Sequence, residues 1–269
     1  MMSRLLRRLV QAAAALTLGS LALVVGYILV KGVPHLSPKL FEPEYNTQNV
    51  SMLPAIVNTL IMTAVSLAVA LPLGVFAAVY LVEYARRGSR LVALIRITAE
   101  TLAGIPSIIY GLFGLLFFVT AIKMGFSILA GALTLTLMIL PLVLRTTEEA
   151  LQAVPDLYRE GAYGLGAGRL RTVFRIVLPS AAPGILAGVI LAVGRIVGET
   201  AALLYTAGTV PNFPKGLLSS GRTLSVHMFA LASEGLYMDQ GYATAVVLLI
   251  VVFLINMMSG AIAKRIAKG

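Results

Sequence analysis

Two charged residues stand four positions apart in an apolar stretch, GILAGVILAVGRIVGETAALL. They are Arg195 and Glu199, and on a helix this spacing places both side chains on one face. An uncompensated charge at bilayer depth costs at least about 2.5–3.5 kcal/mol, so each must be paired, face protein or line water. One interpretation is an intrahelical ion pair that neutralises itself. The other is a route for a charged solute, with Arg195 attracting an anion and Glu199 holding the arginine in position.

Candidates for other chemistry are few. The sequence contains no cysteine and two histidines, His35 and His227, which both fall between apolar runs, where we expect surface residues rather than ligands. His227 lies in TLSVHMFALASEG, whose apolar spacing allows a short helix on the outer face. No nucleotide P-loop, zincin motif or nucleophile elbow occurs. We therefore expect no catalytic residue, no metal site and no cofactor in this chain.

The composition indicates an integral membrane protein. The 269 residues are 59% hydrophobic and 12% charged, whereas soluble domains carry about 25% charged residues. A helix needs roughly 20 residues to cross the hydrocarbon core, and six apolar runs reach that length. We predict an all-α membrane protein with one domain, residues 1–269, and six transmembrane helices. The predicted spans are residues 9–30, 55–82, 97–122, 127–145, 184–207 and 241–263.

The distribution of basic residues predicts the orientation. With both termini inside, the inner segments hold about three times as many lysines and arginines as the outer segments. This excess places both termini in the cytoplasm. The net charge of +10 then reflects topology, so we expect contacts with the lipid bilayer and no nucleic-acid partner.

Glycine and proline predict bends and close packing. Pro106 lies in LAGIPSIIYGLFG and should kink the third run, either as a packing bend or as a pore-lining bend beside Ser107. In the fifth run, two G-x-x-x-G repeats would let another helix backbone approach closely. The glycines of these repeats are Gly184, Gly188, Gly194 and Gly198.

A basic, glycine-rich segment, EGAYGLGAGRLRTVFRIVLP, separates the fourth and fifth runs on the predicted inner side. Its glycines disfavour one continuous helix. We predict a helix that begins at Pro155, a turn near Gly166 and a second helix from Arg169, after which Pro179 and Pro183 should break the chain. The segment either lies on lipid headgroups or docks into a groove of a soluble partner, and the tight turns favour docking.

This segment resembles a known family. The motif E-A-A-x3-G-x9-I-x-L-P of ABC importer permeases matches from Glu160 to Pro179, with Gly161 in place of the usual first alanine. Three further stretches, LAGIPSIIYGLFG, LRTTEEALQAVP and GRIVGETAALLYTAG, are similar to the permease subunits of the phosphate ABC transporter. TLSVHMFALASEG resembles the PstA type of subunit rather than the PstC type.

The resemblance implies a type I ABC importer permease fold with a cytoplasmic coupling-helix loop at about 155–180. It implies a PstC-like permease, two copies of a PstB-like ATPase that binds ATP and Mg, and a PstS-like phosphate-binding protein outside. The function would be import of inorganic phosphate across a prokaryotic inner membrane, with molybdate, sulfate or phosphonate as alternative solutes. The implied translocation residues are Arg195 and Glu199, to which we add Pro106 and Ser107; the implied ATPase-coupling residues are Glu160, Gly161, Ala162, Gly166 and Arg169.

Two other classes of protein compete with this interpretation. An ion-driven secondary transporter needs no ATPase, but it predicts repeats between the two halves of the chain, and the glycine-rich loop occurs once. A purely structural membrane scaffold leaves the charges of Arg195 and Glu199 without a purpose.

Overall fold

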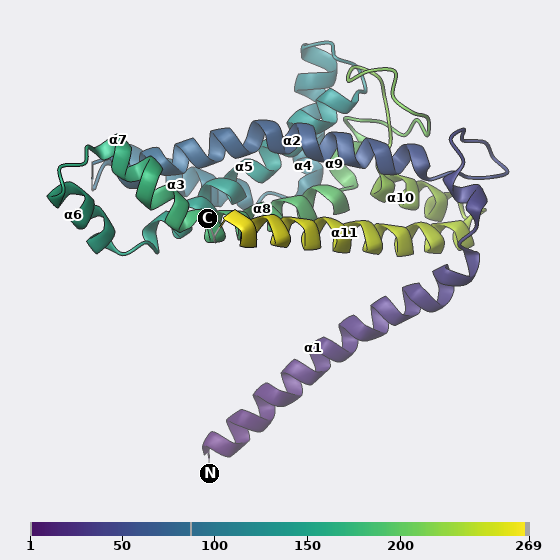
Figure 1. Cartoon of the computed structure of the whole chain (residues 1–269). Helices are drawn as coiled ribbons and strands as arrows, with labels where there is room; N and C mark the ends of the chain where they lie inside the picture. The colour runs from purple at the N-terminus through teal and green to yellow at the C-terminus, as the bar shows by residue number, and fades with distance from the viewer. Residues whose placement is uncertain (1, 87, 267–269) are drawn as a thin grey trace.

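A computed structural model describes residues 2–86 and 88–266, and within these ranges the chain forms helices and loops without a strand (Figure 1). Five helices are long and apolar enough to cross a membrane, and a bent pair adds a sixth crossing if it counts as one span. The long helices are α1 (Met2–Gly32), α2 (Leu53–Val79), α5 (Ile128–Gln152), α8 (Leu178–Gly198) and α11 (Met238–Ile266).

The centre of the bundle is α5, which packs between α2 and α8. In lipid the hydrophobic effect does not drive helices together, so close contacts and interhelical hydrogen bonds must do so. Gly74 of α2 lies directly against Val143 of α5, and the Ser66 hydroxyl donates to the Ala132 carbonyl across the same interface at 3.0 Å. The fully buried side chains of α5 include Ile128, Leu135, Met138, Ile139 and Leu151.

Helix α1 diverges from the other helices and meets them only near its C-terminal end (Figure 1). There the Tyr27 ring makes an edge-to-face contact with Tyr242 of α11 at 5.9 Å, and Gly32 lies against the Tyr242 backbone. Along the rest of α1 the apolar side chains are exposed, Leu16 at 76% for example. The first predicted span is therefore helical, but its apolar surface contributes little to the core of this chain.

The third predicted span, 97–122, is not one helix. It consists of α3 (Arg90–Ala103), α4 (Ser107–Gly114) and the π-helical segment η4 (Leu115–Ala121), with a bend of 99° between α3 and the following helix. The break falls at Pro106, which has no N–H for an intrahelical hydrogen bond and clashes with the preceding turn. Its ψ of 140° is extended. The expected kink is thus a full change of direction.

The fifth predicted span, 184–207, is also wrong at its second end. Helix α8 ends at Gly198, and a separate short helix, α9 (Ala201–Leu204), follows. Glu199 is extended, with ψ of 129°, and its carboxylate accepts a hydrogen bond from the Ala202 N–H at 3.1 Å. Gly198 is a poor helix former, and the Glu199 side chain that follows it caps the next helix, so both residues favour this interruption.

The start of the same span differs in the opposite sense, because Pro179 and Pro183 do not break the chain. Helix α7 (Arg169–Thr172), the π-helical segment η5 (Val173–Val177) and α8 form one uninterrupted rod from Arg169 to Gly198. Pro179 lies in the first turn of α8, where proline is tolerated, and the preceding π-helical turn can adjust the backbone hydrogen bonds around it. Pro183 lies inside α8, and the helix continues past it. The expected break is therefore absent.

Short elements complete the two ends of the bundle. The α6 end comprises the π-helical segment η3 (Tyr80–Tyr84), the end of α5, α6 (Asp156–Gly164) and α7, and the α10 end lies opposite (Figure 1). The segment between α1 and α2 has the little regular structure its prolines suggest. Its elements are η1 (Val33–His35) and η2 (Pro38–Phe41), and the helix that gives the α10 end its name is α10 (Leu224–Glu234).

Candidate functional site

The loop between α5 and α8 folds as the predicted helix, turn and helix. Helix α6 starts directly after Pro155, with Asp156 in its first turn, where a negative charge is favourable. Gly166 has φ of +79°. The Ala167 N–H donates to the Ala162 carbonyl and the Gly166 N–H to the Tyr163 carbonyl, which is the Schellman pattern that requires a left-handed residue. Glycine is the residue type that adopts this conformation without strain.

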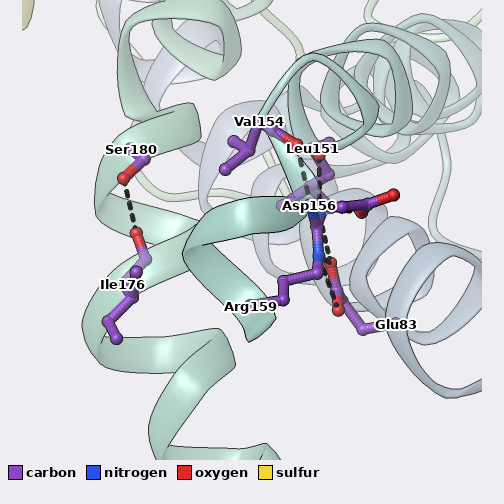
Figure 2. Close-up of polar contacts among 7 residues, drawn as sticks. All are labelled: Glu83, Leu151, Val154, Asp156, Arg159, Ile176 and Ser180. Carbon is purple, nitrogen blue, oxygen red and sulfur yellow. Dashed lines mark hydrogen bonds and ion pairs between the residues drawn. The ribbon is translucent and has the colours of Figure 1, made fainter. Parts of the chain in front are cut away.

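One buried arginine holds α6 against the bundle. Figure 2 shows Arg159 of α6 pointing towards Glu83 of η3, the segment that continues the end of α2, and the Arg159 Nη2 lies 2.7 Å from Oε1 of Glu83. The same guanidinium donates to the carbonyls of Leu151 and Val154 at 3.0 and 2.8 Å and to Asp156. The side chains of Arg159 and Glu83 are only 14% and 5% exposed. Hydrogen bonding to Glu83 raises the pKa of Arg159, so this residue stays charged.

No sequence motif marks this pair. Glu83 and Arg159 are 76 positions apart, and neither belongs to the EAA-type spacing. The available signal was a glutamate at the inner end of an apolar run, where a charge without a partner is unfavourable.

The opposite face of α6 is open. Leu165 is 91% exposed, and Leu157 and Tyr158 are also exposed. Among the described residues no atom approaches the position of a Cβ on Gly161 or Gly164 within 4 Å. Apolar side chains beside uncovered backbone can receive a partner surface at close range. Of the predicted coupling residues, Glu160 and Gly161 lie on this surface, Ala162 is buried, Gly166 forms the turn, and Arg169 stacks over the Tyr84 ring at 5.0 Å.

The intrahelical ion pair between Arg195 and Glu199 is absent. Glu199 lies beyond the end of α8, so the two side chains no longer share a helix face. Glu199 is buried, its carboxylate caps α9, and its carbonyl accepts from the Ser225 hydroxyl at 2.6 Å. Arg195 is half-buried and forms neither an ion pair nor a side-chain hydrogen bond within the described part of the chain. All eleven aspartate and glutamate side chains of the sequence belong to that part.

The two interrupted spans meet where α4 packs on α9. Gly111 of α4 packs so closely on α9 that a Cβ would lie 2.7 Å from the Ala202 Cα. The Tyr110 hydroxyl donates to the Leu102 carbonyl at 2.8 Å across the break in the third span. Pro106 is exposed and Ser107 half-buried at the start of α4. Pro106 and Ser107 thus begin the helix that packs on α9, Glu199 caps α9, and Arg195 lies in the last turn of α8 as an unpaired charge.

The two glycine repeats of α8 behave differently. A Cβ on Gly184 would lie 2.7 Å from the Ala150 Cβ of α5, and a Cβ on Gly188 would overlap Thr146. At Gly194 and Gly198, by contrast, no described atom lies within 4 Å. The first repeat therefore serves the predicted helix packing, whereas the second packs against nothing in the described chain.

A second buried cation lies at the α10 end. Arg222 is 5% exposed, and its guanidinium lies over the Tyr45 ring at 4.8 Å. The Tyr45 ring also meets His227 edge to face. His227 is fully buried, so its expected surface position is wrong. Burial, with a smaller contribution from the Arg222 charge, lowers the pKa of His227 to about 3, which keeps the ring neutral.

Comparison with known proteins decides the family. The family model described as "Binding-protein-dependent transport system inner membrane component" matches residues 70–269. The chain belongs to this family. It is therefore a multi-pass inner-membrane permease of a binding-protein-dependent transport system, and it is not itself the catalytic ATPase of that system.

Individual relatives of this permease agree with the family assignment. The probable ABC transporter permease protein YqgI of Bacillus subtilis (strain 168) is 36% identical over 236 residues, 81% of this chain and 80% of that protein. The phosphate transport system permease protein PstA of Yersinia pestis is 36% identical over 240 residues, 87% of this chain and 80% of that protein.

A solved structure confirms the fold of the permease. The crystal structure of a bacterial alginate ABC transporter in complex with an alginate pentasaccharide-bound periplasmic protein contains a chain that matches with a TM-score of 0.70. The match covers 100% of this chain and 98% of that chain at 16% identity. The type I ABC importer permease fold implied by the EAA-type loop is therefore confirmed.

Proposed function

We propose that this permease forms half of the translocation pathway of an ATP-driven importer of inorganic phosphate. Relatives named phosphate transport system permease protein PstA support the solute, among them the Yersinia pestis protein matched over 87% of this chain. The observation that carries the proposal is Arg195, a half-buried cation without a carboxylate partner in the last turn of α8, where the helix ends before α9. Such an arginine attracts phosphate oxygens and repels a cationic solute.

The other translocation residues shape the surroundings of this charge. Glu199 is occupied as the cap of α9, so it ends α8 and positions Arg195 through the backbone rather than by an ion pair. Pro106 and Ser107 set the direction of α4, whose first turn is closed by the hydrogen bond from the Ile109 N–H to the Pro106 carbonyl. A moderate binding site suits a pathway, because the solute must leave it as well as enter.

Coupling to ATP would act through α6. A PstB-like ATPase would dock on the exposed surface around Glu160 and Gly161, and a second copy would dock on the PstC-like subunit. The Arg159–Glu83 ion pair transfers force from α6 to α2. The unbroken rod from Arg169 to Gly198 extends from the Gly166 turn to Arg195, about 40 Å at 1.5 Å per residue. Movement of the ATPase would thereby reorient the region around Arg195.

The remaining assignments follow from this arrangement. We place both termini and α6 on the cytoplasmic side, because the segments there carry most of the lysines and arginines. ATP and Mg would bind to the PstB-like ATPase rather than to this chain. A PstS-like binding protein would deliver phosphate to the α10 end.

Uptake of radiolabelled phosphate tests the solute and Arg195 together. Phosphate-starved cells that lack this subunit would receive wild type, Arg195→Ala or the control Arg171→Ala, whose side chain is exposed on α7. We expect wild type and control to restore uptake and Arg195→Ala to lower it about 10- to 100-fold, the loss of one hydrogen bond to a charged group. Membrane levels of the three proteins are matched by immunoblot.

The outcomes separate the solute from the residue. Full phosphate uptake with Arg195→Ala would show that Arg195 has no role in the pathway, but phosphate would remain the assigned solute. No rescue by wild type, with restored uptake of labelled sulfate, molybdate or phosphonate instead, would assign another oxyanion.

The coupling surface needs its own test. Glu160→Lys reverses the charge of an exposed residue, so the protein should insert at normal levels, fail to retain the ATPase on purification and lose transport. Normal transport with this substitution would contradict docking at Glu160.

A further inference from the structure

A polar pocket of about 630 Å³ opens at the α6 end, between η3, the start of α3, α6 and α7. Two acidic residues line it, Glu83 and Asp156, and both bind Arg159. Arginines reach the pocket from separate elements of the chain, so the fold rather than the local sequence gathers them. The lining arginines are Arg86, Arg96, Arg159 and Arg169.

Two of these arginines have no carboxylate partner. Arg96 Nε donates to Glu148 Oε1 at 2.7 Å, and Arg159 is held by Glu83. Arg86 and Arg169 form no ion pair with any of the eleven aspartate and glutamate side chains, all of which are among the described residues. Arg169 is instead fixed over the Tyr84 ring. The pocket therefore presents two uncompensated positive charges at the end of a membrane-crossing bundle.

An apolar groove of about 340 Å³ lies next to this pocket, between α2, α3 and α5. The two are linked by a smaller charged pocket of about 240 Å³. Ala99 and Leu144 line both the apolar groove and the smaller pocket, and Arg96 lines both charged pockets. The linking pocket carries Glu100, Glu148 and Glu149 beside Arg96 and Arg145, so the surface passes from the apolar groove through mixed charges to the basic pocket. The groove is lined by Leu73, Ala77, Leu94, Ile95, Thr98, Leu102, Leu140 and Pro141 among others.

The groove lies at the depth of acyl chains. Ala77 and Leu73 precede Glu83 by six and ten residues on α2, which places them about 9 and 15 Å further along the helix. Half of a hydrocarbon core of about 30 Å is one leaflet. The apolar groove therefore spans the leaflet on the α6 side, and the basic pocket lies at its headgroup level.

We propose that this surface binds an anionic phospholipid of the leaflet on the α6 side. Its phosphate would lie between Arg86 and Arg169, because guanidinium groups recognise phosphate oxygens with two parallel hydrogen bonds. One acyl chain would lie along the apolar groove. Basic pockets between helices at a membrane surface favour anionic headgroups, and a choline headgroup adds a cation that these arginines repel.

The bound lipid would influence transport through α6. Arg159 and Tyr163 of α6 line the same pocket, so the headgroup contacts the helix on which an ATPase would dock. This inference depends on the membrane position of the α6 end and not on which solute the permease carries. An importer for any solute could contain this lipid site.

Native mass spectrometry of the full chain tests the site. The protein is released from micelles that contain phosphatidylglycerol or phosphatidylcholine with identical acyl chains. We expect wild type to retain one phosphatidylglycerol and Arg86→Gln/Arg169→Gln to bind it about 10- to 30-fold more weakly, at roughly 1 kcal/mol per arginine. The control Arg171→Gln/Arg175→Gln removes the same charge from exposed residues outside the pocket and should bind as wild type does.

Two further measurements identify the occupant. Ala77→Trp fills the groove and should weaken retention of phosphatidylglycerol without changing the basic pocket. Inorganic phosphate at millimolar concentration should not displace the lipid from wild type.

Several results would overturn the inference. Equal retention of phosphatidylglycerol and phosphatidylcholine would show that the site does not select an anionic lipid. An equal loss of phosphatidylglycerol binding in the pocket variant and its control would show that the pocket does not bind it. Displacement by inorganic phosphate would make the pocket a free-anion site. If Ala77→Trp left retention unchanged but prevented assembly with a second permease, the groove would be a subunit interface.

Discussion

Replacing Arg159 with methionine isolates the ion pair that holds α6 on the bundle. Methionine keeps much of the length of the side chain and removes its charge. The change leaves Glu83, which is 5% exposed, as a buried charge without its partner, and it removes donors from the Leu151 and Val154 carbonyls. We expect the free energy of unfolding to fall and α6 to separate from the end of α2.

The size of the effect follows from these contacts. Removing one partner of a buried, hydrogen-bonded ion pair costs about 3–5 kcal/mol. Glu83→Gln should cost less, because Arg159 keeps two carbonyl acceptors and Asp156. In the double variant Glu83→Gln/Arg159→Met no buried charge is left alone. Its cost should therefore be below the sum of the single costs by about 1–3 kcal/mol.

Unfolding of the purified chain in mixed micelles, titrated with sodium dodecyl sulfate, measures all three variants. Arg171→Met serves as the control, because Arg171 is exposed and an exposed substitution stays within about 0.5 kcal/mol of wild type. ATP-driven transport by the assembled importer gives a second readout, which should fall with Arg159→Met. Equal stability of Arg159→Met and Arg171→Met, or strictly additive costs for the pair, would refute the anchoring role.

Three other substitutions test separate features of the structure. The valine of Gly188→Val would overlap Thr146, so this variant should lower the free energy of unfolding by about 1–3 kcal/mol in the same titration. Gly194→Val is the control, because its side chain meets open space. Equal losses of stability in the two variants would contradict the packing described for α8. Gly166→Ala forces alanine to φ of +79°, about 1–2 kcal/mol of strain, and should weaken ATPase binding in a pull-down; unchanged binding would show that the turn adapts. His227 stays neutral in the folded chain down to about pH 3, but in the unfolded chain it takes up a proton below about pH 6.5. The free energy of unfolding should therefore fall by about 2 kcal/mol from pH 8 to pH 5. If His227→Gln shows the same dependence of stability on pH, His227 is not its source.

The sequence predicts helical content and the coupling loop well, because both depend on local patterns. Apolar runs of membrane length locate the long helices, and glycine at position 166 marks a turn that only a left-handed residue completes. The match from Glu160 to Pro179 places that loop between the correct helices. Each of these features can be deduced from about 20 neighbouring residues.

Features that depend on contacts between distant segments were not predicted. The end of α8 is set by Glu199, whose carboxylate caps α9 and whose carbonyl binds Ser225, and this partnership competes with helical continuation. The Arg159–Glu83 pair joins positions 76 apart. His227 is buried by Tyr45 and Arg222, although its own neighbours in the sequence resemble an interfacial helix. Pro179 is the opposite case, because its local sequence predicts a helix end that the structure does not have. The π-helical turn before Pro179 lets the helix continue.

The π-helical segment η5, residues 173–177, helps to set how the two ends of the rod between the Gly166 turn and Arg195 are rotated about its axis. One π-helical turn accommodates one more residue than an α-helical turn, so deleting a residue there would let the helix close in α-form. Because a turn of either kind completes one revolution, the two sides would keep their rotation relative to each other. The face that docks the ATPase and the face that presents Arg195 would therefore stay aligned. Deleting a residue from the α-helical part of the rod would instead rotate one face by about 100° relative to the other.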